Sequence, residues 1–346
     1  MLVRGASALA RAAGLPSLII GLTVVAYGTS APEFAVSLKA GLSGQPDIAL
    51  GHVVGSNTFN VLVILGVSAL VIPLAVSAQL VRLDVPVMIG VSVLTWLFAA
   101  DGVVSRWEGL VLFAGVVAYT AMLIRLGRKQ QASAAPPGPE EAARPGRRRL
   151  VVPGLLVVAG LALLVIGARW FVQGAVDLAR LLGISELLVG LTVVAAGTSL
   201  PELATSVVAA IRRERDIAVG NIVGSNIFNI LAVLGASAAV SPAGVAVSQT
   251  ALNFDIPVMV AVAVACLPVF FTGGRISRWE GALFLSYYAA YVTYLVLGAS
   301  HHESLPAFSA AMLFFVMPGT ILGIAISVAH TIRARFHGEA PDDRYC

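Results

Sequence analysis

Apolar residues fill most of the chain in long blocks, and short polar or charged segments separate these blocks. A transmembrane helix needs about 20 mostly apolar residues to cross the hydrocarbon core of a bilayer. By that measure the pattern predicts ten spans, near residues 17–41, 48–73, 84–100, 107–126, 152–170, 187–211, 217–240, 253–272, 279–297 and 306–330. The segment 128–149 is rich in proline, alanine and charged residues, which predicts a solvated, disordered linker.

The composition agrees with this pattern. Of the 346 residues, 58% are hydrophobic and 12% are charged, and the mean hydropathy is +0.92. Soluble proteins carry about a quarter charged residues, so the chain falls in the class of α-helical, multi-span membrane proteins. Cys266 and Cys346 are the only two cysteines, too few for a metal cluster or a disulfide framework. We expect no resident cofactor, no enzymatic activity and no obligatory protein partner.

The basic residues predict how the chain is oriented in the membrane. If the N-terminus, the 128–149 linker and the C-terminus are cytoplasmic, 18 of the 22 Lys and Arg residues lie on the cytoplasmic side. The four exceptions are Lys39, Arg106, Arg169 and Arg180. Cytoplasmic loops of membrane proteins carry such an excess of positive charge. The net charge of +4 is therefore explained by orientation, and it does not indicate nucleic acid.

The two halves of the chain repeat each other. Residues 21–66 align with 190–235 without a gap, and 27 of the 46 pairs are identical. The likeness continues in LDVPVM at 83–88 against FDIPVM at 254–259, and in SRWEG at both 105–109 and 277–281. An odd number of spans separates the two copies, so they cross the membrane in opposite senses. Inverted repeats of this kind are typical of secondary transporters, whose binding sites lie where the halves meet.

The repeat divides the chain into four parts: a first repeat at 1–127, the linker at 128–149, a second repeat at 150–298, and an extra transmembrane helix with a tail at 299–346. The second repeat begins with an apolar helix at 153–170 that has no counterpart in the first. We expect that the first repeat lacks its opening helix because the gene start is truncated; the alternative is a core of nine helices. The span at 306–330 also lacks a counterpart in the first half.

Two carboxylates interrupt the apolar spans at equivalent places. Glu33 ends GLTVVAYGTSAPE at 21–33, and Glu202 ends GLTVVAAGTSLPE at 190–202. Charge at membrane depth costs at least about 2.5–3.5 kcal/mol, which makes both glutamates candidates for function. Residues four apart share a helical face, so we expect hydroxyls beside the glutamates, together with carbonyls freed by the prolines at 32 and 201. The candidate residues are Thr29, Ser30, Thr198 and Ser199, with the carbonyls of Ala26 and Ala195.

The next span of each half carries a second motif, GSNTFN at 55–60 and GSNIFN at 224–229. Its serine and last asparagine are four residues apart and share a helical face. These candidates are Ser56, Asn60, Ser225 and Asn229, whereas Asn57 and Asn226 point elsewhere and could satisfy backbone groups. The set consists entirely of oxygen ligands, which suits Ca²⁺ and, by the same hardness, Na⁺. Two carboxylates neutralise one Ca²⁺, and they could instead accept Na⁺ ions or protons.

Three further polar residues are left out of the predicted site. Asp84 and Asp255 precede prolines at predicted helix starts, and we expect them to cap those helices. His52 stands where the second copy has Asn221. It is interpreted as a satisfied polar residue near the site, with a pH-sensitive residue as the alternative.

The paired motifs resemble the two α-repeats of the calcium/cation antiporter superfamily, and in particular the compact prokaryotic members of its sodium/calcium exchanger family. The resemblance implies two inverted five-helix halves and alternating access. It implies Ca²⁺ ligation by Glu33 and Glu202, and Na⁺ ligation by the hydroxyls and carbonyls named above. Some relatives have aspartate at the position of Asn229, and this departure argues against co-transport of K⁺.

The sequence therefore predicts a bacterial inner-membrane antiporter that exchanges Ca²⁺ for Na⁺. One alternative is Ca²⁺/H⁺ exchange with the two glutamates as titrating groups, and another is a passive cation channel. An intramembrane serine hydrolase is disfavoured because no histidine base accompanies two symmetric serines.

Overall fold

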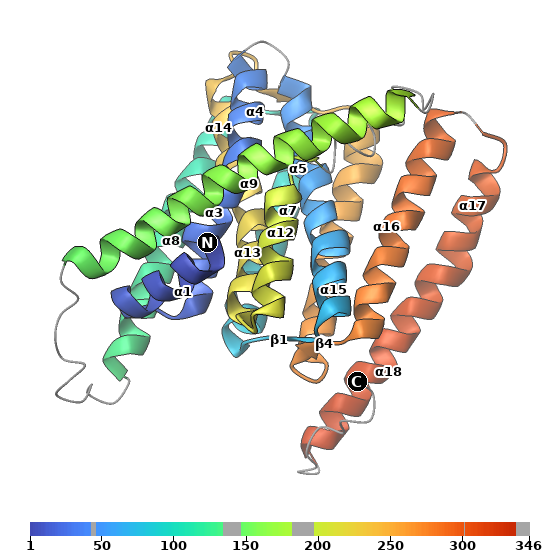
Figure 1. The fold of residues 1–346 in the computed structure, drawn as a ribbon. Coiled ribbons are helices and arrows are strands. Elements are labelled where there is room, and N and C mark those ends of the chain that lie inside the picture. The colour runs from blue at the N-terminus through green and yellow to red at the C-terminus, as the bar shows by residue number, and fades with distance from the viewer. Residues whose placement is uncertain (43–45, 134–146, 182–196, 301, 337–346) are drawn as a thin grey trace.

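The computed structural model describes residues 1–42, 46–133, 147–181, 197–300 and 302–336, and it is built almost entirely from helices (Figure 1). The first half contains α1 (Leu2–Ala13), α2 (Ser17–Ile20), η1 (Gly21–Val25), α3 (Ala26–Thr29), α4 (Ala31–Leu42), α5 (Pro46–Phe59), η2 (Asn60–Leu65), α6 (Gly66–Val71), β1 (Leu74–Ala75), η3 (Leu80–Asp84), α7 (Val85–Phe98), β2 (Val103–Val104) and α8 (Arg106–Ser133). The second half contains α9 (Arg147–Leu181), α12 (Leu200–Ile211), α13 (Arg215–Phe228), η5 (Asn229–Leu234), α14 (Gly235–Val240), β3 (Val245–Ala246), η6 (Ala251–Asp255), α15 (Ile256–Phe271), β4 (Arg275–Ile276) and α16 (Arg278–Ala299). The chain then continues through α17 (Leu305–Ala311), η7 (Met312–Val316) and α18 (Met317–Phe336). Elements labelled η are π-helical turns.

The predicted spans are largely confirmed. Among the described residues, eight helices are long and apolar enough to cross a membrane, and the bent pair Ser17–Thr29 and Ala31–Leu42 forms a ninth span. These nine correspond to nine of the ten predicted spans. The tenth, predicted at 187–211, lies partly outside the described residues, which include only its last part, α12.

The predicted linker is wrong at both ends. Helix α8 continues to Ser133, and α9 already begins at Arg147, so helices occupy the edges of the 128–149 segment. Arg, Lys, Gln and Ala are good helix formers, which lets both helices extend past their apolar parts. Residues 134–146 lie outside the described part of the chain. Helix α9 also continues beyond the predicted end at 170, and it crosses the bundle obliquely as one long helix (Figure 1).

The helices that carry the second motif form the centre of the bundle. In the apolar part of Arg215–Val240, 94% of the residues are buried, and in Ala49–Val71 the share is 78%. The corresponding share is 6% for α16 and zero for the span at Leu305–Ala329. The last span therefore lies at the outer edge of the molecule, beside α16 (Figure 1).

The two halves interlock through paired close contacts. A Cβ atom added to Gly281 of α16 would lie 2.7 Å from the carbonyl oxygen of Gly66 in α6. At the equivalent contact, a Cβ atom on Gly109 of α8 would lie 2.7 Å from the carbonyl oxygen of Gly235 in α14. Small residues let membrane helices approach this closely. Each central helix is thus packed against the last helix of the opposite repeat.

Two short antiparallel strand pairs connect the halves outside the helices. Strand β1 pairs with β4, with Leu74 opposite Ile276, and β2 pairs with β3, with Val104 opposite Val245. Each pair takes one strand from each repeat. The sequence does not predict these strands, since two residues are too few to show the alternation of a strand.

Candidate cation-binding site

The first motif folds as a broken helix in the first half. The axis bends by 49° between Ser17–Thr29 and Ala31–Leu42. At the break, Ser30 has φ −82° and ψ 8°, and Ser199 at the equivalent place has φ −89° and ψ 8°. Proline has no N–H to donate to the carbonyl four residues earlier, which weakens the helix at this turn. The predicted break is therefore present in the first copy, whereas most of the second copy before residue 197 lies outside the described residues.

The bend changes which side chains meet. Thr29 and Glu33 were expected to share a helical face, but they lie on opposite sides of the break. Instead, each serine reaches the carboxylate of the other half (Ser30 Oγ donates to Glu202 Oε1 at 2.8 Å, and Ser199 Oγ donates to Glu33 Oε1 at 3.3 Å). Both glutamates are buried: Glu33 is 2% exposed and Glu202 is 1% exposed. The repeats thus bring their acids to one buried place at the interface between the halves.

The carbonyl of Ala26 is not freed as expected. The proline at 32 removes the partner of the carbonyl of Gly28, four residues earlier, whereas Ala26 O accepts the backbone N–H of Ser30 at 3.0 Å. Two hydroxyls also lie against Ala26 O, namely Thr29 Oγ1 at 3.2 Å and Ser225 Oγ at 3.5 Å. Ala26, Thr29 and Ser225 are therefore gathered together from both halves. The predicted counterpart Ala195 lies outside the described residues.

The central asparagines form a reciprocal cross-link between α5 and α13. Asn57 Nδ2 lies 3.2 Å from the carbonyl of Asn226, and Asn226 Nδ2 lies 3.4 Å from the carbonyl of Asn57. Their side-chain oxygens in turn accept from the second motif: Asn60 Nδ2 donates to Asn226 at 3.0 Å, and Asn229 Nδ2 donates to Asn57 at 3.1 Å. The prediction that Asn57 and Asn226 satisfy backbone groups is correct, but those groups belong to each other and not to the break.

This cross-link fixes the orientation of the two remaining amides. Because their nitrogens are engaged, Asn60 and Asn229 each present Oδ1 without a partner. Among the described residues of the two motifs, the other buried oxygens without a partner are Oε2 of Glu33 and of Glu202 and Oγ of Ser56. An unpaired buried polar atom costs about 1–3 kcal/mol, so five in two repeated motifs call for a ligand. Carboxylate, amide and hydroxyl oxygens are the donors that hard cations prefer.

His52 and Asn221 occupy equivalent places and make equivalent contacts. His52 lies 3.0 Å from both Ser37 Oγ and Thr198 Oγ1, through its two ring nitrogens. Asn221 donates to Ser206 Oγ at 3.0 Å and accepts from Thr29 Oγ1 at 3.1 Å. His52 therefore links Thr198 of the second half to Ser37 of its own half. Asn221 links Thr29 of the first half to Ser206 of its own half in the same way. The interpretation of His52 as a satisfied polar residue agrees with these contacts.

Asp84 and Asp255 are not helix caps, contrary to the prediction. Both have helical backbone angles, because a π-helical turn precedes each of them and continues into the next helix, and neither makes a side-chain cap. Tyr119 donates to Asp84 at 2.9 Å, and Tyr291 donates to Asp255 at 3.1 Å. These pairs join neighbouring helices within each half.

Sequence reasoning missed several of these residues as parts of the site. The surroundings of the site also include Asn221 and two serines, Ser37 and Ser206, each of which stands one helical turn after a glutamate. A signal was present for the two serines, since Ser37 and Ser206 stand at the same offset between the repeats as the glutamates do. A serine or asparagine in a helix nevertheless has many structural uses, so the repeat alone could not separate site from scaffold.

Comparison with known proteins agrees with the geometry of two inverted halves around a buried oxygen cluster. The family model described as "Sodium/calcium exchanger protein" matches residues 1–125 and 152–297. The chain belongs to the sodium/calcium exchanger family. Among its relatives, the sodium/calcium exchanger MaX1 of Methanosarcina acetivorans is 34% identical over 329 residues, which is 85% of this chain and 93% of that protein. The putative antiporter CaxA of Alkalimonas amylolytica is 40% identical over 302 residues, covering 84% of this chain and 91% of that protein.

The fold agrees with a solved member of the family. A structure of the sodium/calcium exchanger from Methanococcus jannaschii superposes with a TM-score of 0.72 at 30% identity, covering 84% of this chain and 91% of that one. The architecture of this family member is therefore that of a multi-pass cation antiporter with inverted repeats.

Proposed function

We propose that this family member exchanges Ca²⁺ for Na⁺ across the membrane by alternating access. The observation that carries the proposal is the set of five unpartnered, buried oxygens, contributed by both repeats and including two carboxylates. In this proposal Glu33 and Glu202 are the main Ca²⁺ ligands, because two carboxylates balance one divalent charge. The amide oxygens of Asn60 and Asn229 complete a hard-oxygen set.

The hydroxyl and carbonyl oxygens next to the glutamates supply a physical basis for exchange. Thr29, Ser30, Thr198 and Ser199 are assigned to Na⁺, with Ser56, Ser225 and the carbonyls of Ala26 and Ala195. Ser30 is hydrogen-bonded to Glu202, and Ser199 is hydrogen-bonded to Glu33. An ion that is ligated by one of these serines therefore competes for space with an ion that is ligated by the glutamate to which that serine is hydrogen-bonded. One cation must then leave before the other binds. The inverted halves allow this place to face either side of the membrane in turn.

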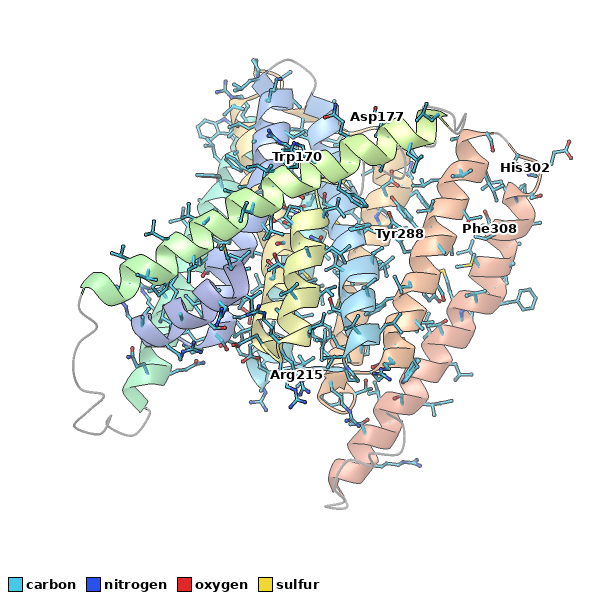
Figure 2. All side chains as sticks on the ribbon, viewed as in Figure 1. Trp170, Asp177, Arg215, Tyr288, His302 and Phe308 are labelled. Carbon is cyan, nitrogen blue, oxygen red and sulfur yellow. The ribbon has the colours of Figure 1, made fainter. Side chains whose placement is uncertain are left out.

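We assign the chain to the bacterial inner membrane, with the N-terminus, the 128–149 linker and the C-terminus in the cytoplasm. The support is the distribution of basic residues. Arg215 lies at the end of the bundle opposite to Asp177 and His302 (Figure 2), and Arg212 and Arg213 stand beside it in the chain. An excess of Arg at one end is expected for the cytoplasmic side.

Exchange of Ca²⁺ for H⁺ is the main alternative, because the same two carboxylates could carry protons. Vesicles with purified protein should be loaded with Na⁺, and uptake of ⁴⁵Ca²⁺ should follow dilution into Na⁺-free buffer. We expect uptake from the Na⁺ gradient and none from a pH gradient alone. Uptake from the pH gradient alone, with none from Na⁺, would overturn the proposal in favour of proton coupling.

A passive channel is tested in the same vesicles. We expect ⁴⁵Ca²⁺ uptake to stop when Na⁺ is replaced by choline inside the vesicles while the membrane potential is held by K⁺ and valinomycin. Uptake that continues without a counter-ion would identify a channel.

A further inference from the structure

A second cavity, of about 450 Å³, lies between α1, the first turns of α9 and the turn that follows α12. It shares no residue with the candidate cation site. Its polar lining comes from Arg4, Ser7 and Arg11 of α1, and from Arg212 and Glu214 of the turn. Val3, Ala8 and Leu156 provide the apolar part of the lining.

The lining carries net positive charge, since it contains three guanidinium groups and one carboxylate. Arg4, Ser7 and Arg11 are spaced three and four residues apart, so they lie on one face of α1. Within the part of the chain that the structure describes, none of the three arginine side chains makes a hydrogen bond or an ion pair. The cavity therefore concentrates unpaired donors that favour an anion with several acceptor oxygens.

Ser7 provides an independent indication of a ligand. Its side chain is 5% exposed and lines the cavity, yet its hydroxyl has no hydrogen-bond partner. A hydroxyl with a local purpose in a helix commonly bonds to a backbone carbonyl one turn earlier, as Thr23 does with Ile19 at 2.6 Å. A buried hydroxyl that is left unpaired beside two arginines is suited to donate to an oxyanion.

We propose that this cavity binds the phosphate headgroup of an anionic phospholipid. Arginine side chains recognise phosphate oxygens, and the apolar residues Val3, Ala8 and Leu156 line the same cavity. Basic pockets at the ends of transmembrane helices bind anionic headgroups in this way. An amphipathic ligand satisfies both parts of the lining, whereas free phosphate satisfies only the basic part.

The test compares lipid binding and needs no transport measurement. Purified full-length protein is placed in nanodiscs of phosphatidylcholine with and without phosphatidylglycerol, and the midpoint of thermal unfolding is measured at fixed ionic strength. We expect phosphatidylglycerol to raise the midpoint. Arg4→Gln and Arg11→Gln should each weaken the apparent lipid affinity about fivefold, since one basic residue near an anionic surface contributes about that factor. Arg82→Gln is the matched control, because Arg82 is exposed and does not line the cavity.

Ser7→Ala separates a ligand site from a merely structural role. In phosphatidylcholine alone this variant should be as stable as the parent or more stable, because it removes an unpaired buried hydroxyl. In phosphatidylglycerol it should lose part of the lipid-dependent shift, while Ser237→Ala, which removes another unpaired buried hydroxyl, should keep the full shift. An equal shift in all variants would overturn the proposal. The proposal would also be overturned if inorganic phosphate, added to the protein in phosphatidylcholine nanodiscs, reproduced the whole shift in the unfolding midpoint, because the ligand would then be a free anion.

Discussion

Ser30 donates to Glu202 across 172 residues of sequence, and the bond joins the first motif of one repeat to the first motif of the other. Its length of 2.8 Å is typical of an O–H···O hydrogen bond, whereas the equivalent pair, Ser199 and Glu33, is separated by 3.3 Å. The two carboxylates are thus held by hydroxyls that come from the opposite half. A displacement that separates the two motifs would break both hydrogen bonds.

The difference in length leads to a prediction about stability in ion-free buffer. Ser30→Ala should lower the free energy of unfolding by about 1–3 kcal/mol, because it leaves Glu202 Oε1 buried without this donor, and Ser199→Ala should lower it by less. The measurement is thermal unfolding of the purified protein in detergent with chelator. A double-mutant cycle with Glu202→Met, which removes the acceptor oxygen, should give a coupling energy of at least about 0.5 kcal/mol for Ser30. Additive effects within error would contradict the pairing.

The two buried glutamates should both be required for Ca²⁺ transport. Glu33→Gln and Glu202→Gln each keep the size of the side chain and remove one negative charge, so a bound Ca²⁺ would be only half neutralised in an apolar environment. We expect Na⁺-driven ⁴⁵Ca²⁺ uptake to fall at least about 100-fold in each variant. That figure corresponds to roughly 3 kcal/mol, a typical loss for an uncompensated buried charge.

Asp177→Asn provides the control for charge removal in general, because Asp177 is an exposed acid on α9 outside the motifs. It should keep the uptake of the parent. If both glutamine variants retained Ca²⁺ flux, the assignment of the site to these residues would be wrong.

The asparagine cross-link should be a structural requirement of the site. Asn226→Ala removes the acceptor of Asn60 Nδ2 and the donor to the carbonyl of Asn57, leaving two buried groups unpaired. The expected loss is about 1–3 kcal/mol for each unpaired group, measured as the shift in thermal unfolding. Asn253→Ala should change stability by less than about 0.5 kcal/mol, since within the described part of the chain the exposed side chain of Asn253 is hydrogen-bonded only to Gln249. Equal stability of the two variants would mean that the cross-link contributes nothing.

His52 should be replaceable by the residue that stands at the same place in the other half. His52→Asn can bond to both Ser37 and Thr198 in the way that Asn221 bonds to Ser206 and Thr29, so we expect uptake within about twofold of the parent. His52→Ala leaves both hydroxyls without this partner and should destabilise the protein by about 1–3 kcal/mol. Uptake measured from pH 5.5 to 8 should follow the same profile in the parent and in His52→Asn. A pH dependence that disappears in His52→Asn would instead favour the pH-sensitive alternative.

Much of the fold follows from local sequence. A transmembrane helix must contain about 20 mostly apolar residues to cross the bilayer, and that requirement is visible in a single stretch of chain without knowledge of its neighbours. The prolines at 32 and 201 similarly predict a break, because the missing N–H affects only the preceding turn. The linker prediction failed at its edges for a related reason: helix ends outside the membrane depend on propensity, which the hydropathy pattern does not report.

The sequence by itself also determined that Glu33 and Glu202 are the equivalent carboxylates of two apolar spans of opposite direction, which makes them the candidates for function. Tertiary structure decided how they are used. Ser30 is hydrogen-bonded to Glu202 and not to Glu33, the glutamate of its own motif. Asn226 orients Asn60 through a hydrogen bond although the two residues are 166 positions apart in the chain. The partner of a buried polar atom is set by how two halves pack, and no periodicity within one helix contains that information.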